Sequence, residues 1–166
     1  FFVRKVSSRG LMLVNVIPLE EYVEGVVENE MPTSWPLSAL KAQAVASRTF
    51  SVFRMLAARD KAYDVRPDFQ AYAVPENKSE NVDRAVKETA GIVMVYKGRV
   101  FPSFFHGMCG GVTDYAGNNW NYPFKFPENV QYCKFCSENV EKVTWSCSFA
   151  AGDIERTDSG GYGRSS

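Results

Sequence analysis

The sequence predicts an α+β fold in a single domain, with a central buried helix at about residues 37–58. Three observations predict it: a long apolar segment after Pro36, short stretches typical of a small antiparallel sheet, and two closely spaced metal-ligand pairs that would pin a loop. The chain has 166 residues and is 45% hydrophobic, which is enough for one full core. We place the domain at residues 1–158 and expect the polar, glycine-rich residues 159–166 to form a flexible tail.

The first helix is predicted to begin after Pro18 and to end near Asn29. Proline suits a first helical turn, and the two glutamates that follow it offset the positive end of the helix dipole. Pro32 disfavours helical geometry in the residue before it, so the helix cannot continue past that point. Glu30 is therefore expected on an elbow between two helices, where its side chain can be directed into a cleft.

The second helix is predicted to start after Pro36, and a helical wheel places apolar side chains around more than half of its circumference. These residues are Leu37, Leu40, Ala44, Val45, Thr49, Val52, Phe53 and Leu56. Arg48 lies on the same helix, and a buried arginine needs a carboxylate or several acceptors. Glu28 and Glu30 are the nearest candidates along the chain.

Four further segments complete the predicted fold. They are a strand at 10–16, a long loop at 60–78, a short helix between Ser79 and Gly91, and a strand pair at 92–96 and 99–105 that turns at Lys97-Gly98. A loop as long as 60–78 in a compact domain is often functional.

A zinc site is predicted from the only histidine and three of the four cysteines. His106 and Cys109 form one pair with two residues between them, and Cys133 and Cys136 form another with the same spacing. Thiolates and an imidazole suit Zn²⁺, and four protein ligands make a closed site that organises the fold. We therefore expect one structural zinc per chain, which pins the 106–136 loop.

Other uses of the cysteines stay open. Four cysteines in an exported protein can form two disulfides, although His106 would then be unexplained. A thioredoxin-like use of Cys133 and Cys136 lacks an evident strand-to-helix context, and Cys147 is more typical of a small buried hydrophobe. An open site with three ligands would instead suit a zinc amidase that cuts stem peptides.

The charge balance argues against a nucleic-acid partner, because Lys plus Arg equals Asp plus Glu at 19 each. No apolar run approaches the roughly 18 residues that span a bilayer. The first residues resemble the middle of a strand and carry no signal peptide, so we expect the chain to lack its natural start and to be truncated at both ends.

Several blocks of the sequence closely resemble the SpoIID/LytB family of bacterial cell-wall proteins, from about residue 10 to residue 147. The blocks are Pro18-Leu19-Glu20-Glu21-Tyr22, Gly25-Val26-Val27, Glu30-Met31-Pro32, residues 39–50, Gln70-Ala71-Tyr72, residues 85–91 and residues 106–113. The block at 39–50, ALKAQAVASRTF, is the most specific of them. The resemblance implies a sporulation-type lytic transglycosylase that cleaves the MurNAc–GlcNAc bond of peptidoglycan to 1,6-anhydro products, with Glu30 as the acid. It also implies export to the cell wall or a membrane anchor facing it.

Candidate sugar contacts follow from residue types that hold glycans. The aromatic platforms would be Tyr72, Trp120 and Tyr122, and the polar contacts would be Gln43, Arg48 and Gln70. A hydrolase would need a second carboxylate, for which only Asp68 and Asp114 offer themselves through the fold. The family also contains non-catalytic wall-binding activators of a separate amidase, and we keep that role as the alternative.

Overall fold

The computed structural model describes residues 1–5, 10–66, 68–74, 78–119, 126–127, 130–138, 146 and 148. The chain divides into two compact units, residues 1–105 with 116–128, and residues 106–115 with 129–166. The predicted boundary at 158–159 and the predicted tail lie outside the described residues. Within the described part, no helix has the length and apolar character needed to cross a membrane.

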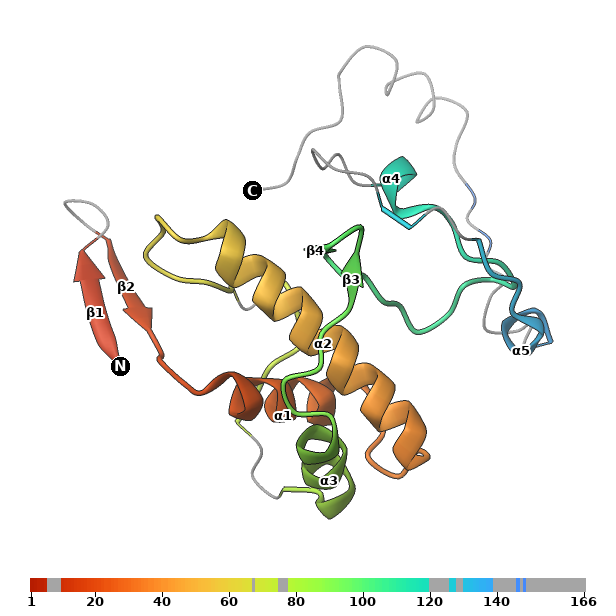
Figure 1. Cartoon of the computed structure of the whole chain (residues 1–166), viewed down its shortest axis with the longest axis horizontal. Coiled ribbons are helices and arrows are strands. Elements are labelled where there is room, and N and C mark those ends of the chain that lie inside the picture. The colour runs from red at the N-terminus through yellow and green to blue at the C-terminus, as the bar shows by residue number, and fades with distance from the viewer. Residues whose placement is uncertain are drawn as a thin grey trace, which may run out of the picture. The chain divides into compact units, whose positions relative to one another are not determined.

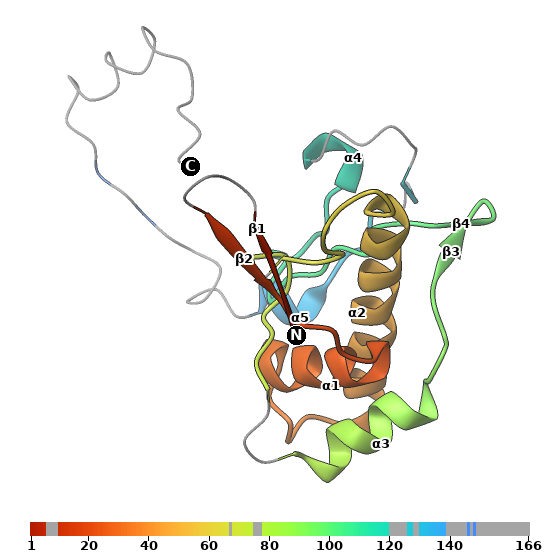
Figure 2. The same cartoon turned by 90° about the vertical axis from the view of Figure 1, so that its left-hand side faces the viewer.

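Three helices build the core of the first unit: α1 (Leu19–Glu30), α2 (Leu37–Ala57) and α3 (Glu80–Glu88). Both α1 and α3 pack against α2, as the two views in Figures 1 and 2 show. The buried cluster between them consists of Val23, Val27, Leu40, Ala44, Val82, Ala85 and Val86. The prediction of a long core helix after Pro36 is confirmed.

The ends of α1 and α2 follow the prolines. Pro18 and Pro36 stand immediately before the two helices, with φ of −57° and −54°. The chain leaves α1 at Met31, whose φ of −150° and ψ of 155° are extended, as expected for a residue that precedes a proline. Glu30 is thus the last residue of α1, and the predicted elbow between the two helices is confirmed.

The strands form two separate antiparallel ribbons. β1 (Phe2–Lys5) pairs with β2 (Leu11–Val14), with Phe2 opposite Val14, and β3 (Val95–Tyr96) pairs with β4 (Arg99–Val100). Lys97 and Gly98 both have positive φ, 50° and 74°, so the two-residue turn between β3 and β4 has the expected hairpin geometry. The predicted small antiparallel sheet does not cover the central helix: α1 and α3 pack on α2, and of the described strands only β4 contacts it.

The second ribbon is shorter than the predicted strands at 92–96 and 99–105. Two contacts with α2 replace ladder hydrogen bonds here: Met94 N donates to Thr49 Oγ1 at 2.9 Å, and the Ile92 carbonyl accepts from Arg48 at 3.2 Å. Pro102 has no backbone N–H to donate, which ends the pairing on the other side.

Arg48 has a different partner from the two that sequence proximity suggested. Its side chain is fully buried, and Nε and Nη2 donate to both carboxylate oxygens of Glu20 at 2.7 to 3.2 Å. Glu28 instead accepts from Ser79 N at 2.7 Å, and Glu30 turns to the 68–74 segment. The prediction of Glu28 or Glu30 was wrong because the packing of α1 on α2 brings the first turn of α1, not its end, to Arg48.

Candidate functional site

Glu30 opens into a pocket of about 470 Å³ in the first unit. The wall comes from the end of α1, the C-terminal half of α2, and two loop segments: Glu30, Phe50, Arg54, Asp68, Phe69, Gln70, Ser103, Phe104 and Phe105. Aromatic rings thus surround one carboxylate on an elbow, one further acid and one arginine. Sequence reasoning did not single out Arg54 or Phe69, because nothing in their local pattern separates them from ordinary core or surface residues.

The Glu30 carboxylate is held by the backbone. Its Oε1 accepts a hydrogen bond from Ala71 N at 2.6 Å, and the side chain is only partly exposed. No hydrogen bond to Oε2 is found among the described residues, so one oxygen is fixed by the backbone while the side chain lines the pocket. A carboxyl group oriented in this way, at the edge of a pocket, can deliver a proton to a bound molecule.

Gln70 lines the pocket, but its side chain is buried and hydrogen-bonded within the protein. It is only 4% exposed, and its Oε1 accepts from Tyr22 Oη at 3.3 Å and from Ser51 Oγ at 3.1 Å. Burial, followed by the nearby Tyr72 and Glu30, raises the pKa of Tyr22 to about 12. Tyr22 therefore stays protonated and donates to Gln70, which holds the start of the 70–74 segment against α1.

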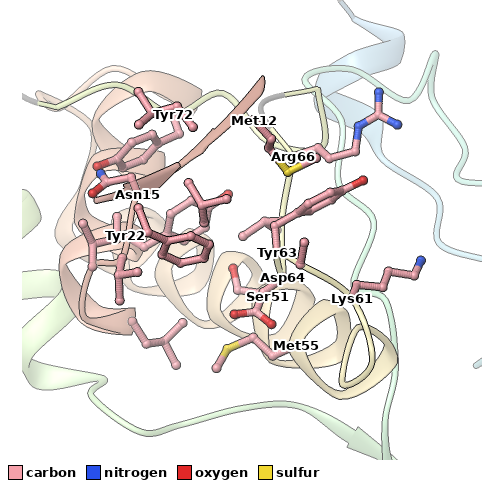
Figure 3. A pocket seen from close by; sticks show the side chains of 18 residues that line it. Met12, Asn15, Tyr22, Ser51, Met55, Lys61, Tyr63, Asp64, Arg66 and Tyr72 are labelled. Carbon is pink, nitrogen blue, oxygen red and sulfur yellow. The ribbon is translucent and has the colours of Figure 1, made fainter. Parts of the chain in front are cut away.

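A larger cavity of about 840 Å³ lies on the side of the first unit next to β2 and the 61–66 loop. Figure 3 shows Tyr22, Tyr63 and Tyr72 around it, with Met12 and Met55 among the apolar walls. The acid among its lining residues is Asp64, whereas Glu30, on the predicted elbow, lines the smaller pocket. The smaller pocket is therefore the candidate site, and the larger cavity presents a second aromatic surface.

Tyr72 belongs to this larger cavity and stacks on Tyr22, with ring centroids 5.0 Å apart and an interplanar angle of 20°. The stack depends on Gly25 in α1, where an added Cβ would lie 2.6 Å from Tyr72 Cε2 and 2.8 Å from Ala73 O. Only glycine allows the 72–73 segment to approach the helix this closely. The Gly25-Val26-Val27 block was one of those that resemble the family, and the close approach of the 72–73 segment explains why residue 25 is glycine.

The other residues predicted to contact sugar lie in different parts of the structure. Gln43 donates to Ser47 Oγ at 3.1 Å and lines neither cavity. Arg48 is fully buried, and its donors serve the protein itself. Trp120, like Tyr122, lies outside the described residues. Asp68 lines the Glu30 pocket and forms an ion pair with Arg66 at 3.0 Å.

Three of the four predicted metal ligands come together in the second unit. The sulfur atoms of Cys109, Cys133 and Cys136 all lie within 4.8 Å of one another, and none of the three is in a disulfide. Ligands held at about 2.3 Å in a tetrahedron are roughly 3.8 Å apart, so sulfur atoms within 4.8 Å of one another are close enough to hold a metal ion. His106 is exposed and stands outside this cluster in the structure, although only two residues separate it from Cys109.

Local backbone structure explains the convergence of the cysteines. Val112 bridges Tyr132, Thr113 N donates to Gln131 O at 2.9 Å, and Cys133 N donates to Gly111 O at 2.8 Å. Gly110 and Gly111 have φ of 65° and 108°, which let the first loop fold back on itself. The short α5 (Lys134–Ser137) then presents Cys136 beside Cys133.

The thiols also influence one another electrostatically. The backbone N–H of Cys136, followed by its side chain, lowers the pKa of Cys133. The pKa of Cys136 is raised: a backbone hydrogen bond from Cys109 lowers it, but the side chains of Cys109 and Cys133, together with burial, outweigh that contribution. One thiol ionises easily and the next resists, so a bound cation would be needed to hold several thiolates together.

The family of the chain follows from comparison with known proteins. The family model described as SpoIID, stage II sporulation protein, matches residues 7–96, a segment that contains α1, α2, α3 and Glu30. The chain belongs to the SpoIID family. The resemblance expected from the 18–50 segment is thereby confirmed.

Individual relatives agree with the family assignment. The chain is 33% identical over 135 residues to stage II sporulation protein D of Bacillus amyloliquefaciens, with 71% of this chain and 39% of that protein covered. It is 38% identical over 101 residues to the amidase enhancer of Bacillus subtilis, with 60% and 13% covered. An uncharacterized protein of Brachyspira hyodysenteriae is 40% identical over 111 residues, with 65% and 30% covered. The chain therefore spans well under half the length of these relatives.

Proposed function

We propose that this SpoIID-family chain is a peptidoglycan lytic transglycosylase that uses Glu30 as its acid and then its base. The observation that supports the proposal most is the Glu30 carboxylate, which lines an aromatic pocket and is held through Oε1 by Ala71 N. Family membership points to the cell wall as the place of action. We propose accordingly that the whole protein is exported and faces the peptidoglycan.

The proposed reaction needs one carboxyl group. Protonated Glu30 gives its proton to the oxygen of the MurNAc–GlcNAc bond as that bond breaks, and positive charge develops on the muramyl anomeric carbon. The carboxylate that remains then takes the proton of the muramyl 6-hydroxyl, whose oxygen closes on the anomeric carbon. The products are a new GlcNAc hydroxyl and a 1,6-anhydro-muramyl end, and no water is consumed.

A hydrolytic reaction would require a second carboxylate to activate water. Asp68 lines the same pocket, but Arg66 already pairs with it at 3.0 Å and both side chains are more than half exposed. This arrangement favours the one-acid reaction. Asp114 belongs to the second unit.

We also propose that Cys109, Cys133 and Cys136 hold one zinc ion, with His106 as the fourth ligand after a movement of its side chain. The three-thiol cluster supports this, since its sulfur atoms lie close enough together to share one cation. Such a zinc would stabilise the paired 109–113 and 131–136 segments rather than activate water.

The similarity to a protein named amidase enhancer supports a second candidate. In that case the chain would bind the wall and stimulate a separate amidase without cleaving glycans itself. The two candidates differ in what they require from Glu30, because a binding module would tolerate its conversion to an amide.

The test incubates the chain with defined glycan strands and identifies the new ends by mass spectrometry. We expect 1,6-anhydro ends from the wild type and a loss of at least two orders of magnitude in rate for Glu30→Gln. Glu28→Gln is the matched control, since Glu28 lies in the same helix but accepts from Ser79 N away from the pocket. Reducing ends would replace the proposal by hydrolysis, a Glu30→Gln variant that still cleaves would remove Glu30 from the mechanism, and a wild type that cleaves no glycan would leave the amidase-activator role.

A further inference from the structure

Arg54 is the one basic residue among those that line the Glu30 pocket. It lies in the last turn of α2, and its guanidinium carbon is 4.0 Å from the centroid of the Phe69 ring. Its Nε is buried and finds no hydrogen-bond partner among the described residues. Part of a desolvated cation is thus left without an acceptor beside the proposed catalytic acid.

The neighbouring carboxylates do not supply that acceptor. Asp68 pairs with Arg66, and Glu30 accepts from the backbone of Ala71. Within the described part of the chain, Arg54 forms no ion pair with any acid. By contrast, Arg48 in the same helix is bonded to a carboxylate and to several carbonyl groups.

A position in the last turn of a helix favours a cation, because the helix dipole is negative there. The helix dipole explains why a cation is favoured at Arg54. It does not explain why Nε is shielded from water without gaining a hydrogen-bond acceptor. A buried donor with no acceptor is costly, and such groups are often completed by a bound ligand. The ring of Phe69 covers one face of the guanidinium and itself meets Phe50 edge-on at 6.3 Å, so the plane of the N–H donors is fixed in advance.

We propose that Arg54 binds a carboxylate of the muramyl residue next to the bond that Glu30 cleaves, and so selects anionic muramyl strands over neutral GlcNAc polymers. The inference rests on the proposed function. A planar guanidinium matches a carboxylate in a two-point contact. Muramic acid differs from GlcNAc by a lactyl ether, whose carboxyl group is free when no stem peptide is attached. When a peptide is attached, the lactyl group is an amide and the nearest carboxylates belong to the peptide.

Binding measurements in the Glu30→Gln background test the inference without cleavage. The ligands are a muramyl tetrasaccharide with free lactyl carboxylates, the same sugar with those groups amidated, a peptide-bearing strand, and a GlcNAc tetramer. We expect the free carboxylate to improve Kd roughly tenfold or more over the amidated sugar, as charge-assisted hydrogen bonds do. Arg54→Gln should remove that difference and leave the amidated sugar unaffected, and Arg54→Lys should restore part of it.

Arg66→Gln is the matched control. Arg66 also lies near the Phe69 ring, at 5.9 Å, but it is exposed and already paired with Asp68. We expect it to keep the preference for the carboxylate, and thermal melting verifies that each variant is folded.

Three results would overturn the inference: equal affinity for the free and amidated sugars, an equal loss for both in Arg54→Gln, or an equal loss of preference in Arg66→Gln. Tight binding of the peptide-bearing strand that also depends on Arg54 would assign the contact to a peptide carboxylate. If the chain binds the neutral and anionic sugars equally and wild type still makes anhydro ends, only the Arg54 inference fails. If it binds no glycan, the proposed function fails with it.

Discussion

Removal of the Glu20 carboxylate should destabilise the first unit far more than removal of its neighbour in the same helical turn. Arg48 is fully buried, and Glu20 supplies three of its shortest hydrogen bonds, at 2.7, 3.0 and 3.2 Å. Glu20 also accepts from Gly91 N at 3.2 Å, which ties the segment after α3 to α1. Glu20→Ala leaves the charge of Arg48 with only backbone carbonyls and one hydroxyl.

The burial of the ion pair sets the expected loss in the free energy of unfolding. Breaking one side of a buried ion pair costs about 3–5 kcal/mol. The Glu20 side chain is 40% exposed, so water can partly replace it, and the low end of about 3 kcal/mol is expected. For a chain of this size that corresponds to a fall in Tm of roughly 6–12 °C.

Urea unfolding followed by circular dichroism measures the free energy directly. Glu21→Ala is the matched control, since Glu21 occupies the same first turn and interacts with the same helix dipole but is exposed. A double variant, Glu20→Ala with Arg48→Met, should recover part of the loss because no charge remains buried. The reasoning is refuted if Glu20→Ala costs no more than Glu21→Ala, or if the double variant shows the full sum of the two single losses.

Four further outcomes are expected. Gly25→Ala should lower stability and quench the Tyr22–Tyr72 stack, because its Cβ would lie 2.6 Å from the Tyr72 ring; near-ultraviolet circular dichroism checks this, and an unchanged spectrum would contradict it. Ala44→Leu should overpack the core and cost about 1–3 kcal/mol in urea unfolding, and a neutral effect would mean that the core is loosely packed. Because the pKa of Tyr22 is raised in the folded state, its protonated hydroxyl contributes fully to stability below about pH 10, and this contribution is lost as the pH rises through about 12. Tyr22→Phe should therefore flatten the fall in the free energy of unfolding in that window. An identical pH profile would refute the burial of that hydroxyl. Purified chain should contain about one equivalent of zinc by elemental analysis, and Cys136→Ser should lose much of it and melt lower, whereas metal-free wild type with disulfides would exclude the site.

Much of the local structure could be predicted from the sequence. Pro18, Pro36 and the residue before Pro32 set the limits of α1 and α2 because proline acts within one or two residues of its own position. The same locality placed Glu30 on its elbow and positioned the Lys97-Gly98 turn. Cys133 and Cys136 meet in one turn of chain, as their spacing predicts, but Cys109 joins them through the pairing of the 111–113 and 131–133 segments, and His106 stays outside the cluster.

Other features required the tertiary structure. The partner of Arg48, the burial of Gln70 and the short second ribbon depend on how α1, α3 and the 68–74 segment pack on α2. Arg54 joins Glu30 in one pocket only because the end of α2 and the end of α1 meet there. The sequence by itself determined the family, the helix limits and the local cysteine geometry, since each rests on residues close together in the chain. Long-range packing decided which charges are paired, which are buried and which are left for a ligand. The reason is that desolvation depends on contacts between residues that are far apart in the sequence.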